Sequence, residues 1–303
     1  MFRKAFLGMA VFTAISLTAC TSQSVTGTEV DASWEKSAAL VGPAVYCIGF
    51  MDDGQFVEVG TGFAVAENLL ATNAHVALAL AEVLMGYSDQ VEMVAVQNGG
   101  LVGGAGYYQL GSFAIHPGYK DTLTDTFDFG IVTTKTKMPS WVEFESSANV
   151  KKLAVGMEVA TIGFPGELEY AYAENPIATF KNGTISALRA FDGAITTPTN
   201  GFFIQHNLNL SPGTSGSPIF NRDGKVVAVN NSGYSIYVHS YNDELGEEVW
   251  DNIPVGNLGF GIRADRFGPT LTVPRTSFSS LQFDPNYWED QGLAKRRVIV
   301  AKR

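Results

Sequence analysis

Three short segments carry residue types that could act together on an acyl group. In the first, the stretch SPGTSGSPIF at residues 211–220, small residues flank Ser215 on both sides. Gly213 and Gly216 permit backbone conformations that a side chain forbids, so neighbouring N–H groups can converge on one point. An oxyanion hole for acyl transfer needs such a pair of donors. The alternative is a plain Gly/Ser turn between strands, which the composition of this segment alone would favour.

The other two segments contribute a histidine and an aspartate. His75 comes at the end of LATNAHV, residues 70–76, where an apolar strand gives way to a turn. Asp128 opens the apolar run FDFGIV, residues 127–132. A buried carboxylate costs free energy unless it is paired and hydrogen-bonded. Taken singly, His75 fits a structural role and Asp128 fits a turn or cap, so the three segments gain meaning only together.

The elements that would position these residues are mostly short strands. The charged fraction is low at 17 %, and the 32 glycines suit many turns. A short Ala- and Leu-rich helix is predicted directly at His75, over residues 74–85. Strands are predicted at residues 45–50, 56–65, 69–72, 91–96, 107–115 and 129–134, and again at 159–163, 185–188, 202–205, 217–220, 226–230 and 258–263. The pattern predicts an all-β fold with two halves of roughly six strands.

The segments between the strands are predicted as connections. Residues 99–106 are rich in glycine and are predicted as a loop, and residues 149–156 as a linker between the halves. Residues 234–252 are polar and acidic and are predicted as an insertion.

The charge balance limits the partners. A net charge of −10 disfavours nucleic acid, because phosphate binding needs clustered Lys and Arg. The basic cluster at residues 295–297 is interpreted as a solvated tail, with a binding patch as the alternative. Apolar residues make up 46 % of the chain, enough for a substantial core.

The N-terminus has the pattern of a secretory signal. Arg3 and Lys4 precede an apolar stretch at residues 5–19, which is short for a membrane span. The sequence LTAC at residues 17–20 resembles the lipobox of bacterial lipoproteins, which implies cleavage before Cys20 and its lipidation. An ordinary signal peptide that happens to contain a cysteine is the alternative. We therefore expect residues 1–19 to be a signal peptide and residues 20–40 a lipidated, flexible tether.

The lipid would hold the protein at a membrane. Thr21 follows the cysteine, and there is no Asp of the kind that resembles an inner-membrane retention signal. That favours the outer membrane, facing the periplasm or the cell surface. Cys47, the other cysteine, lies in an apolar run and is predicted to be a buried, inert thiol.

The strings TNAHV, FDFGIV and GTSGSPIF, in this order, resemble the catalytic segments of chymotrypsin-like serine proteases. The bacterial HtrA/Deg and glutamyl endopeptidase branches resemble them most. Supporting strings are GTGF at 60–63, HPGY at 116–119, NGTIS at 182–186 and GFGIR at 259–263. The resemblance covers about residues 41–265. It implies two six-stranded antiparallel β-barrels with the active site between them. Barrel one would span about 41–150 and barrel two about 151–268, and 269–303 would be a C-terminal extension.

The resemblance also implies the role of each residue. Ser215 would attack a carbonyl carbon, His75 would accept its proton, and Asp128 would hold the imidazole. The N–H groups of Gly213 and Ser215 would form the oxyanion hole. Such a site needs no metal and no organic cofactor.

Several positions depart from the family pattern. Thr214 stands where pancreatic-type enzymes have an Asp, so their activation switch is not expected. Asn209, often the pocket floor, is uncharged, and the expected wall at Asn230, Asn231 and Ser232 has no histidine. These residues predict a neutral pocket for small or medium apolar side chains. After residue 265 only 38 residues remain, too few for a PDZ domain of about 90 residues.

The other histidines are expected to be structural. His116 is predicted in a turn and His239 in the insertion. His206 is predicted in the core, with a place in the pocket lining as the alternative.

The sequence favours one function over two others. The leading hypothesis is a serine endopeptidase acting on exported or extracellular proteins, with a protein or peptide as its partner. The first alternative is a catalytically idle protease-fold protein used for binding or assembly at the cell envelope. The second is an esterase or acyl transferase, whose α/β-hydrolase form is excluded by the order His, Asp, Ser along the chain.

Overall fold

The structure is a computed structural model that describes residues 33–87, 91–99, 106–120, 127–166, 176–242, 247–267 and 276–277. The chain divides into two units, Met1–Asp31 and Ala32–Arg303, and all described residues belong to the second. The predicted signal peptide, Cys20 and the tether up to residue 32 therefore lie outside the described residues. So does the C-terminal extension, apart from residues 276–277.

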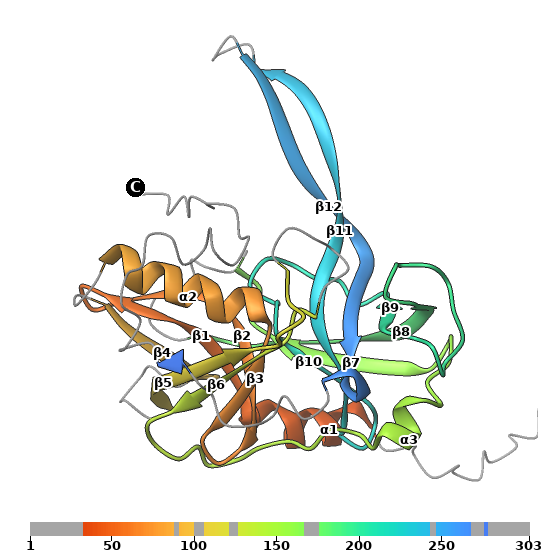
Figure 1. Cartoon of the computed structure of the whole chain (residues 1–303), viewed down its shortest axis with the longest axis horizontal. Coiled ribbons are helices and arrows are strands. Elements are labelled where there is room, and N and C mark those ends of the chain that lie inside the picture. The colour runs from red at the N-terminus through yellow and green to blue at the C-terminus, as the bar shows by residue number, and fades with distance from the viewer. Residues whose placement is uncertain are drawn as a thin grey trace, which may run out of the picture. The chain divides into compact units, whose positions relative to one another are not determined.

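The first half folds into a barrel of antiparallel strands. Its strands are β1 Val45–Asp52, β2 Gln55–Ala66, β3 Leu69–Thr72, β4 Val91–Gln97, β5 Tyr107–Ile115 and β6 Gly130–Thr134. They are ordered β5-β4-β1-β2-β3-β6, and a pairing between β5 and β6 closes the ring (Figure 1). A short strand, β13 Thr276–Ser277, adds to the outside of β5.

The second half forms a closed barrel of its own. Its strands are β7 Glu158–Gly163, β8 Thr179–Arg189, β9 Phe203–His206, β10 Pro218–Phe220, β11 Val226–Asn242 and β12 Glu247–Arg263. They close in the order β10-β11-β12-β9-β8-β7. The predicted all-β fold with two six-stranded antiparallel barrels is confirmed.

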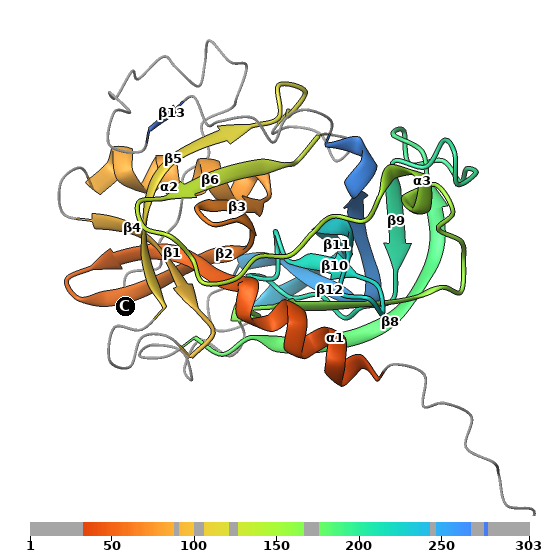
Figure 2. The same ribbon diagram turned by 90° about the horizontal axis from the view of Figure 1, so that it is seen from below.

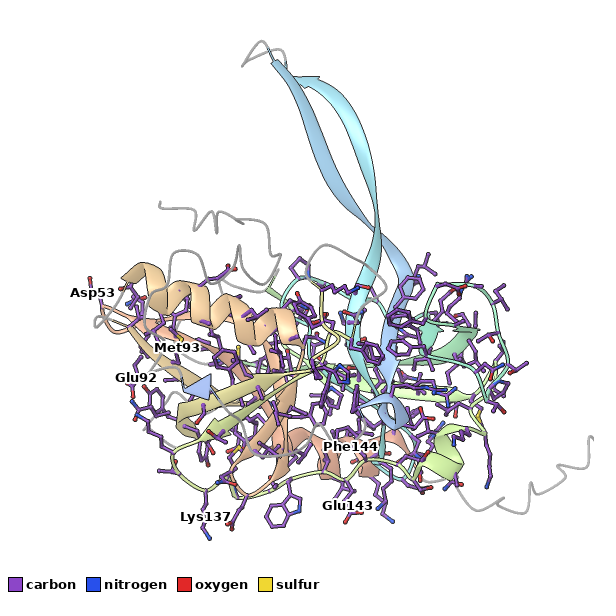
Figure 3. All side chains as sticks on the ribbon, viewed as in Figure 1. Asp53, Glu92, Met93, Lys137, Glu143 and Phe144 are labelled. Atoms are coloured by element: carbon purple, nitrogen blue, oxygen red, sulfur yellow. The ribbon has the colours of Figure 1, made fainter. Side chains whose placement is uncertain are left out.

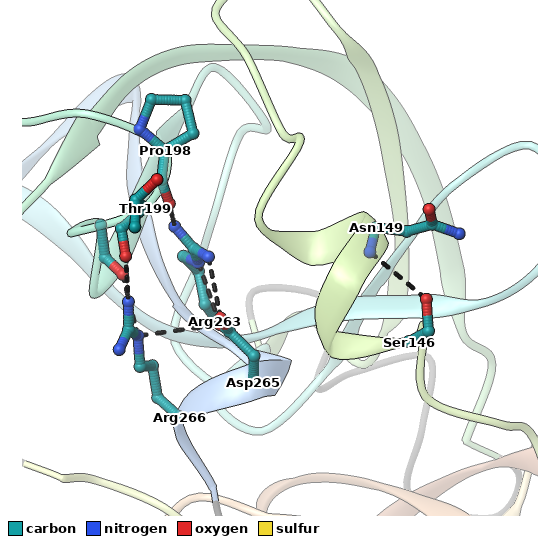
Figure 4. A network of polar contacts seen from close by, with 8 residues as sticks. Ser146, Asn149, Pro198, Thr199, Arg263, Asp265 and Arg266 are labelled. Atoms are coloured by element: carbon teal, nitrogen blue, oxygen red, sulfur yellow. Dashed lines mark hydrogen bonds and ion pairs between the residues drawn. The ribbon is translucent and has the colours of Figure 1, made fainter.

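Helices are few in the described chain. α2 (Ala74–Tyr87) follows β3, and the four-residue α3 (Ser147–Val150) begins within the segment joining the barrels. The predicted linker at 149–156 thus starts as a turn of helix, with the Ser146 hydroxyl accepting a hydrogen bond from Asn149 N (Figure 4). Among the described residues, no helix has the length and apolar character needed to cross a bilayer.

The prediction of a flexible tether over residues 20–40 is wrong at its C-terminal end. Residues Trp34–Val41 form α1, which lies beside barrel two (Figure 2). The Trp34 ring lies 6.1 Å from the Phe220 ring, and the Arg222 guanidinium lies 4.4 Å from the Trp34 ring centre. The Ser37 hydroxyl donates to the Arg222 carbonyl at 2.8 Å. These contacts with a turn far along the chain hold a short helix that propensity alone would leave marginal.

Residues 234–252, which were predicted as an insertion, belong to two long paired strands. β11 and β12 remain paired antiparallel from Ala228↔Arg263 to Asn242↔Glu247, with two register shifts near residues 230–235. The two strands therefore continue beyond the barrel as a two-stranded ribbon (Figure 1).

Aromatic packing joins the two barrels. One cluster of buried apolar residues fills barrel one and continues into the junction through Phe164, Phe202 and Phe220. Phe144 lies on the segment that runs from one barrel to the other (Figure 3). Its ring packs edge-on against Phe63, with 5.9 Å between ring centres. Because this shared core spans both halves, the faces that carry the candidate site are held against each other.

Candidate active site

His75 and Asp128 are brought together by the pairing of two strands. His75 lies in the first turn of α2, just after β3, and Asp128 precedes β6. β3 pairs with β6, with Thr72 opposite Gly130. His75 Nδ1 lies 2.6 Å from Asp128 Oδ2, and the His75 backbone N–H donates to Asp128 Oδ1 at 2.9 Å.

This contact has a chemical consequence for the imidazole. The Asp128 carboxylate is 5 % exposed and the His75 side chain 36 % exposed, so the pair extends from the interior toward solvent. A carboxylate beside Nδ1 favours the tautomer with the proton on Nδ1. The Nε2 lone pair, on the far side of the ring, can then accept a proton.

Packing around Asp128 holds it in place. On one side the Phe127 ring stacks on the His116 ring at 4.3 Å, and on the other Phe129 stacks on Phe267 at 3.8 Å. The Asn73 side-chain amide donates to the Asp128 carbonyl at 2.9 Å. His116 thus lies in a turn, as predicted, and also supports the aspartate segment.

The loop that carries Ser215 depends on its two glycines. Gly213 has φ +87° and Gly216 φ +85°, both in the left-handed region that favours glycine. A Cβ on Gly213 would lie 2.5 Å from the Phe164 carbonyl oxygen, and one on Gly216 would lie 2.1 Å from the Thr61 carbonyl oxygen. Thr214 N donates to the Ser211 carbonyl at 3.1 Å and closes the turn. No other residue type fits these two positions without moving backbone.

Two donors in this loop are unused. Within the described chain, neither the Gly213 N–H nor the Ser215 N–H has a hydrogen-bond partner in the protein. Buried or half-buried N–H groups are nearly always paired, so two unpaired donors one residue apart are unusual. They are available to a bound group that carries negative charge.

The Ser215 loop lies against the elements that carry His75. Thr61 N donates to the Ser215 carbonyl at 2.9 Å. A Cβ on Gly60 would lie 2.8 Å from the Val76 side chain and 3.3 Å from the Ser215 carbonyl oxygen. The structure thus brings all three predicted residues to one place, where β2, α2 and the loop before β10 meet.

Sequence reasoning missed the polar residues that hold this arrangement. The Thr61 hydroxyl donates to the Gly213 carbonyl at 2.8 Å and accepts from Phe164 N at 3.1 Å. The Thr72 hydroxyl donates to the Thr61 carbonyl at 2.7 Å. The signal in the sequence was a threonine among apolar residues and glycines, at Thr61 in VGTGFAV and again at Thr72 in LLAT.

The four residues predicted to form the specificity pocket do not line one cavity. Asn230 is 1 % exposed and lies behind the nucleophile loop, where its N–H donates to Ser217 O at 2.9 Å and its carbonyl accepts from Gly216 N at 3.1 Å. Asn231 and Ser232 line a cavity of about 640 Å³ on barrel two. Asn209 is exposed, does not line this cavity, and accepts from the Lys181 ammonium at 2.6 Å through its carbonyl.

His206 is a core residue, as predicted. It is fully buried and points toward Gly259, where a Cβ would lie 2.3 Å from the imidazole Cε1. Burial lowers the pKa of His206 to about 4, although the nearby Asn230 side chain and Phe260 backbone oppose the shift. The imidazole is therefore neutral at physiological pH.

Cys47 is an inert thiol. Cys47 is buried, and burial together with the Glu58 carboxylate raises the pKa of its thiol, as expected of an inert cysteine. In the part of the chain that the structure describes, no three His, Cys, Asp or Glu side chains are placed to hold a metal ion.

The model of the trypsin-like peptidase domain matches residues 60–229. The chain belongs to the trypsin-like peptidase family. The matched residues include His75, Asp128 and Ser215, and the resemblance to chymotrypsin-like serine proteases is confirmed.

A probable periplasmic serine endoprotease, DegP-like, of Halomonas elongata is 30 % identical over 175 residues. These residues are 57 % of this chain and 29 % of that protein, so the chain matches less than a third of the length of this curated relative.

Solved HtrA-type structures are similar at lower identity. The HtrA-type protease AlgW with a tripeptide has a TM-score of 0.47 and 17 % identity, covering 77 % of this chain and 60 % of that chain. The serine endoprotease from Yersinia pestis has a TM-score of 0.46 and 18 % identity, covering 76 % of this chain and 62 % of that chain.

Proposed function

We propose that this protein is a serine endopeptidase that hydrolyses peptide bonds in exported or extracellular proteins. The observation that carries the proposal is the 2.6 Å contact between His75 Nδ1 and Asp128 Oδ2, beside a loop that presents Ser215. Membership of the trypsin-like peptidase family supports it.

The mechanism follows from the three side chains. Ser215 Oγ attacks the carbonyl carbon of the scissile bond while His75 Nε2 takes its proton. Asp128 stabilises the imidazolium that forms. His75 then gives the proton to the leaving amine nitrogen, and the C–N bond breaks. Water, activated by the same imidazole, hydrolyses the acyl-enzyme and regenerates the Ser215 hydroxyl.

The unused donors of the loop have a role in this reaction. The carbonyl oxygen of the substrate becomes an oxyanion in each tetrahedral intermediate. The N–H groups of Gly213 and Ser215 would receive it, and removing one such donor typically costs about 10²–10³-fold in kcat. Because both N–H groups are fixed before substrate arrives, they need little reorganisation during the reaction.

The proposal includes a place at the cell envelope. A lipid on Cys20 would tether the domain to the outer membrane, facing the periplasm or the cell surface. The Halomonas relative is named as a periplasmic protein, which supports export of this chain. We expect tritiated palmitate, supplied to growing cells, to label the full chain and not to label Cys20→Ser.

Hydrolysis of an unfolded protein separates this function from an idle binding protein. We expect casein incubated with the full chain to release peptides with new amino termini, detected by mass spectrometry. Ser215→Ala should abolish release. Ser186→Ala, which changes an exposed serine on β8 of the same barrel, should not. A folded full chain that releases no peptides would favour the binding alternative.

A further inference from the structure

The cavity on barrel two extends the site beyond the reacting residues. Its volume is about 640 Å³, and it is lined by residues of β8, β9, β11 and β12 and of the loop that follows β8. Phe203 and Gln205 of β9 share one face of that strand by alternation, while His206 belongs to the face that points into the barrel. The cavity is therefore on the outer face of the barrel.

The cavity lies within reach of a peptide bound at Ser215. Its wall includes Asn231, Ser232 and Gly233, which directly follow Asn230 along β11. Asn230 is hydrogen-bonded through its backbone to both Gly216 and Ser217. Three residues of extended chain span about 10 Å. The wall formed by Asn231, Ser232 and Gly233 therefore lies within about 10 Å of the loop that carries Ser215. A side chain of the substrate near the scissile bond can enter the cavity.

Arg189 gives the cavity a positive charge, and no ion pair with another described residue neutralises it. Its guanidinium donates through Nε at 2.9 Å and Nη2 at 2.6 Å to the Gln205 side-chain oxygen. Nη1 donates to the Gly193 carbonyl at 3.2 Å. All of these acceptors are neutral, and among the described residues no carboxylate forms a salt bridge with Arg189. Three of the five N–H donors are used, which leaves two for a ligand.

The one acidic residue that lines the cavity does not fill this role. The Asp192 carboxylate accepts a hydrogen bond from Ala194 N at 3.0 Å within its own turn. Gln205 instead holds the guanidinium in one orientation without cancelling its charge. Arginine presented in this way matches a carboxylate, which can accept two parallel hydrogen bonds.

The remaining walls are apolar, and their position is fixed. Phe191, Phe203, Leu258 and Phe260 line the cavity. Phe191 is 38 % exposed and contacts Phe127, the neighbour of Asp128, with 5.1 Å between ring centres. Such walls favour a ligand that brings methylene groups as well as charge.

Two arginines at the end of β12 anchor the loop that carries Phe191. The Arg263 guanidinium, 0 % exposed, donates to the Asp265 carboxylate at 2.9 Å and 3.0 Å and also to the Pro198 carbonyl (Figure 4). Arg266 donates to the Thr199 carbonyl at 3.0 Å. The loop between β8 and β9 is thus tied to the end of β12, and the cavity it overhangs is preformed.

We propose that this cavity is a substrate subsite that takes a glutamate side chain of the bound peptide, with its carboxylate on the Arg189 guanidinium. The inference rests on the proposed protease function and names its substrate preference. It differs from the neutral, apolar pocket expected from the sequence, because Arg189 belongs to β8 and was not part of the predicted pocket wall.

The test uses peptides that differ at one position. A positional-scanning library of fluorogenic peptides is cleaved by the full chain, and the position with the strongest preference for Glu is chosen. Matched peptides with Glu, Gln or Lys there are then compared by kcat/KM. We expect Glu to be favoured over Gln by about tenfold, as for a partly buried charge pair. Arg189→Gln should remove the preference and Arg189→Lys should keep part of it.

Lys152→Gln is the matched control for the loss of charge at Arg189. Lys152→Gln removes an equal charge from an exposed position outside the cavity and should leave the Glu preference intact. Thermal unfolding of each variant reports whether it is folded. Equal rates for Glu and Gln at every position, or a preference unchanged in folded Arg189→Gln, would overturn the inference.

Binding of fluorescein-labelled Glu and Gln peptides to Ser215→Ala gives a readout that needs no cleavage. Failure of the proposed function would appear as no cleavage of any peptide, while the Arg189-dependent difference in binding remained. Failure of the subsite would appear as cleavage and binding that ignore Arg189.

Discussion

At position 128 one carboxylate accepts two hydrogen bonds from the same residue, one from the His75 ring and one from its backbone N–H. The backbone contact fixes where the helix begins, and the ring contact fixes the tautomer. An asparagine could keep the first contact. Its NH₂ group would then face His75 Nδ1, and an amide nitrogen cannot accept the proton carried there.

We predict that Asp128→Asn folds normally and loses about 10⁴-fold in kcat, as expected when a triad imidazole is held in the wrong tautomer. Peptide hydrolysis across pH is the measurement. Asp223→Asn, in the exposed turn before β11, is the matched control and should retain full activity. Full activity in Asp128→Asn would contradict the role given to this carboxylate.

His206 predicts how stability depends on pH. In the unfolded chain its pKa is about 6.5, and burial lowers it to about 4 in the folded protein. Between these values the unfolded state binds a proton that the folded state excludes, so stability is full above about 6.5 and falls as pH falls. The full contribution is about 3 kcal/mol.

Urea unfolding at pH 7.5 and 4.0 measures this loss. His206→Gln cannot titrate and should lose less stability over the same interval, by about 3 kcal/mol. Other groups titrate equally in both proteins and cancel in the difference. Identical losses in the two proteins would show that His206 is protonated in the folded state.

At the scale of elements, β2 of barrel one holds the nucleophile loop of barrel two. Thr61 makes two contacts with this loop, through its N–H to the Ser215 carbonyl and through its hydroxyl to the Gly213 carbonyl. The same hydroxyl accepts a hydrogen bond from Phe164 N, just after β7. The loop conformation is thus set from outside by a neighbouring strand.

We predict that Thr61→Val, which keeps the shape and removes the hydroxyl, destabilises the protein by about 1–3 kcal/mol because it leaves two buried groups unpaired. It should also lower kcat more than it raises KM, since the oxyanion donors would be misplaced. Thr61→Ser should restore most of both. A folded Thr61→Val with normal kcat would show that the loop holds its geometry alone.

The elements that the sequence predicted are those with a local signal. The strand at residues 107–115 and the helix beginning at Ala74 appear where alternation or an Ala- and Leu-rich run indicates them. α1 was missed because its stability comes from Trp34 contacting Phe220 and Arg222, far along the chain. The β11–β12 ribbon was not predicted as strands because the polar and acidic composition of residues 234–252 indicated an insertion.

The candidate site likewise divides into residues with a local sequence signal and residues defined by contacts far along the chain. His75, Asp128 and Ser215 were found because their flanking residues form recognisable strings. Thr61 was not, since its contact with Gly213 joins residues 152 positions apart. Arg189 was not found, because the strand was predicted to end at residue 188. The structure also shows that the partner of its guanidinium is the neutral Gln205 side chain, which the sequence does not reveal.

At the scale of the whole described unit, one apolar cluster extends from barrel one into barrel two, which also has a cluster of its own, and the candidate site lies where the barrels meet. The ribbon is different, because its pairs from Ser235↔Pro254 outward are formed between β11 and β12 alone, beyond the closed barrel. An isolated two-stranded ribbon contributes little to the stability of a domain.

We therefore predict that residues 236–253 can be removed and replaced by Asn-Gly, a favoured two-residue hairpin turn, without loss of the site. The shortened chain should fold and should hydrolyse a short fluorogenic peptide at the rate of the full chain. Hydrolysis of casein by the two proteins reports whether the ribbon contributes to larger substrates. Loss of peptide hydrolysis in a folded, shortened chain would place the ribbon in the catalytic unit.

The most direct test of the central claim, that Ser215 is an activated nucleophile, is labelling with a fluorophosphonate probe. We predict that the full chain is labelled on Ser215, as mapped by mass spectrometry, and that Ser215→Ala and His75→Ala are not labelled. No labelling of the folded, unmodified chain would contradict the claim, as would labelling that persists without His75.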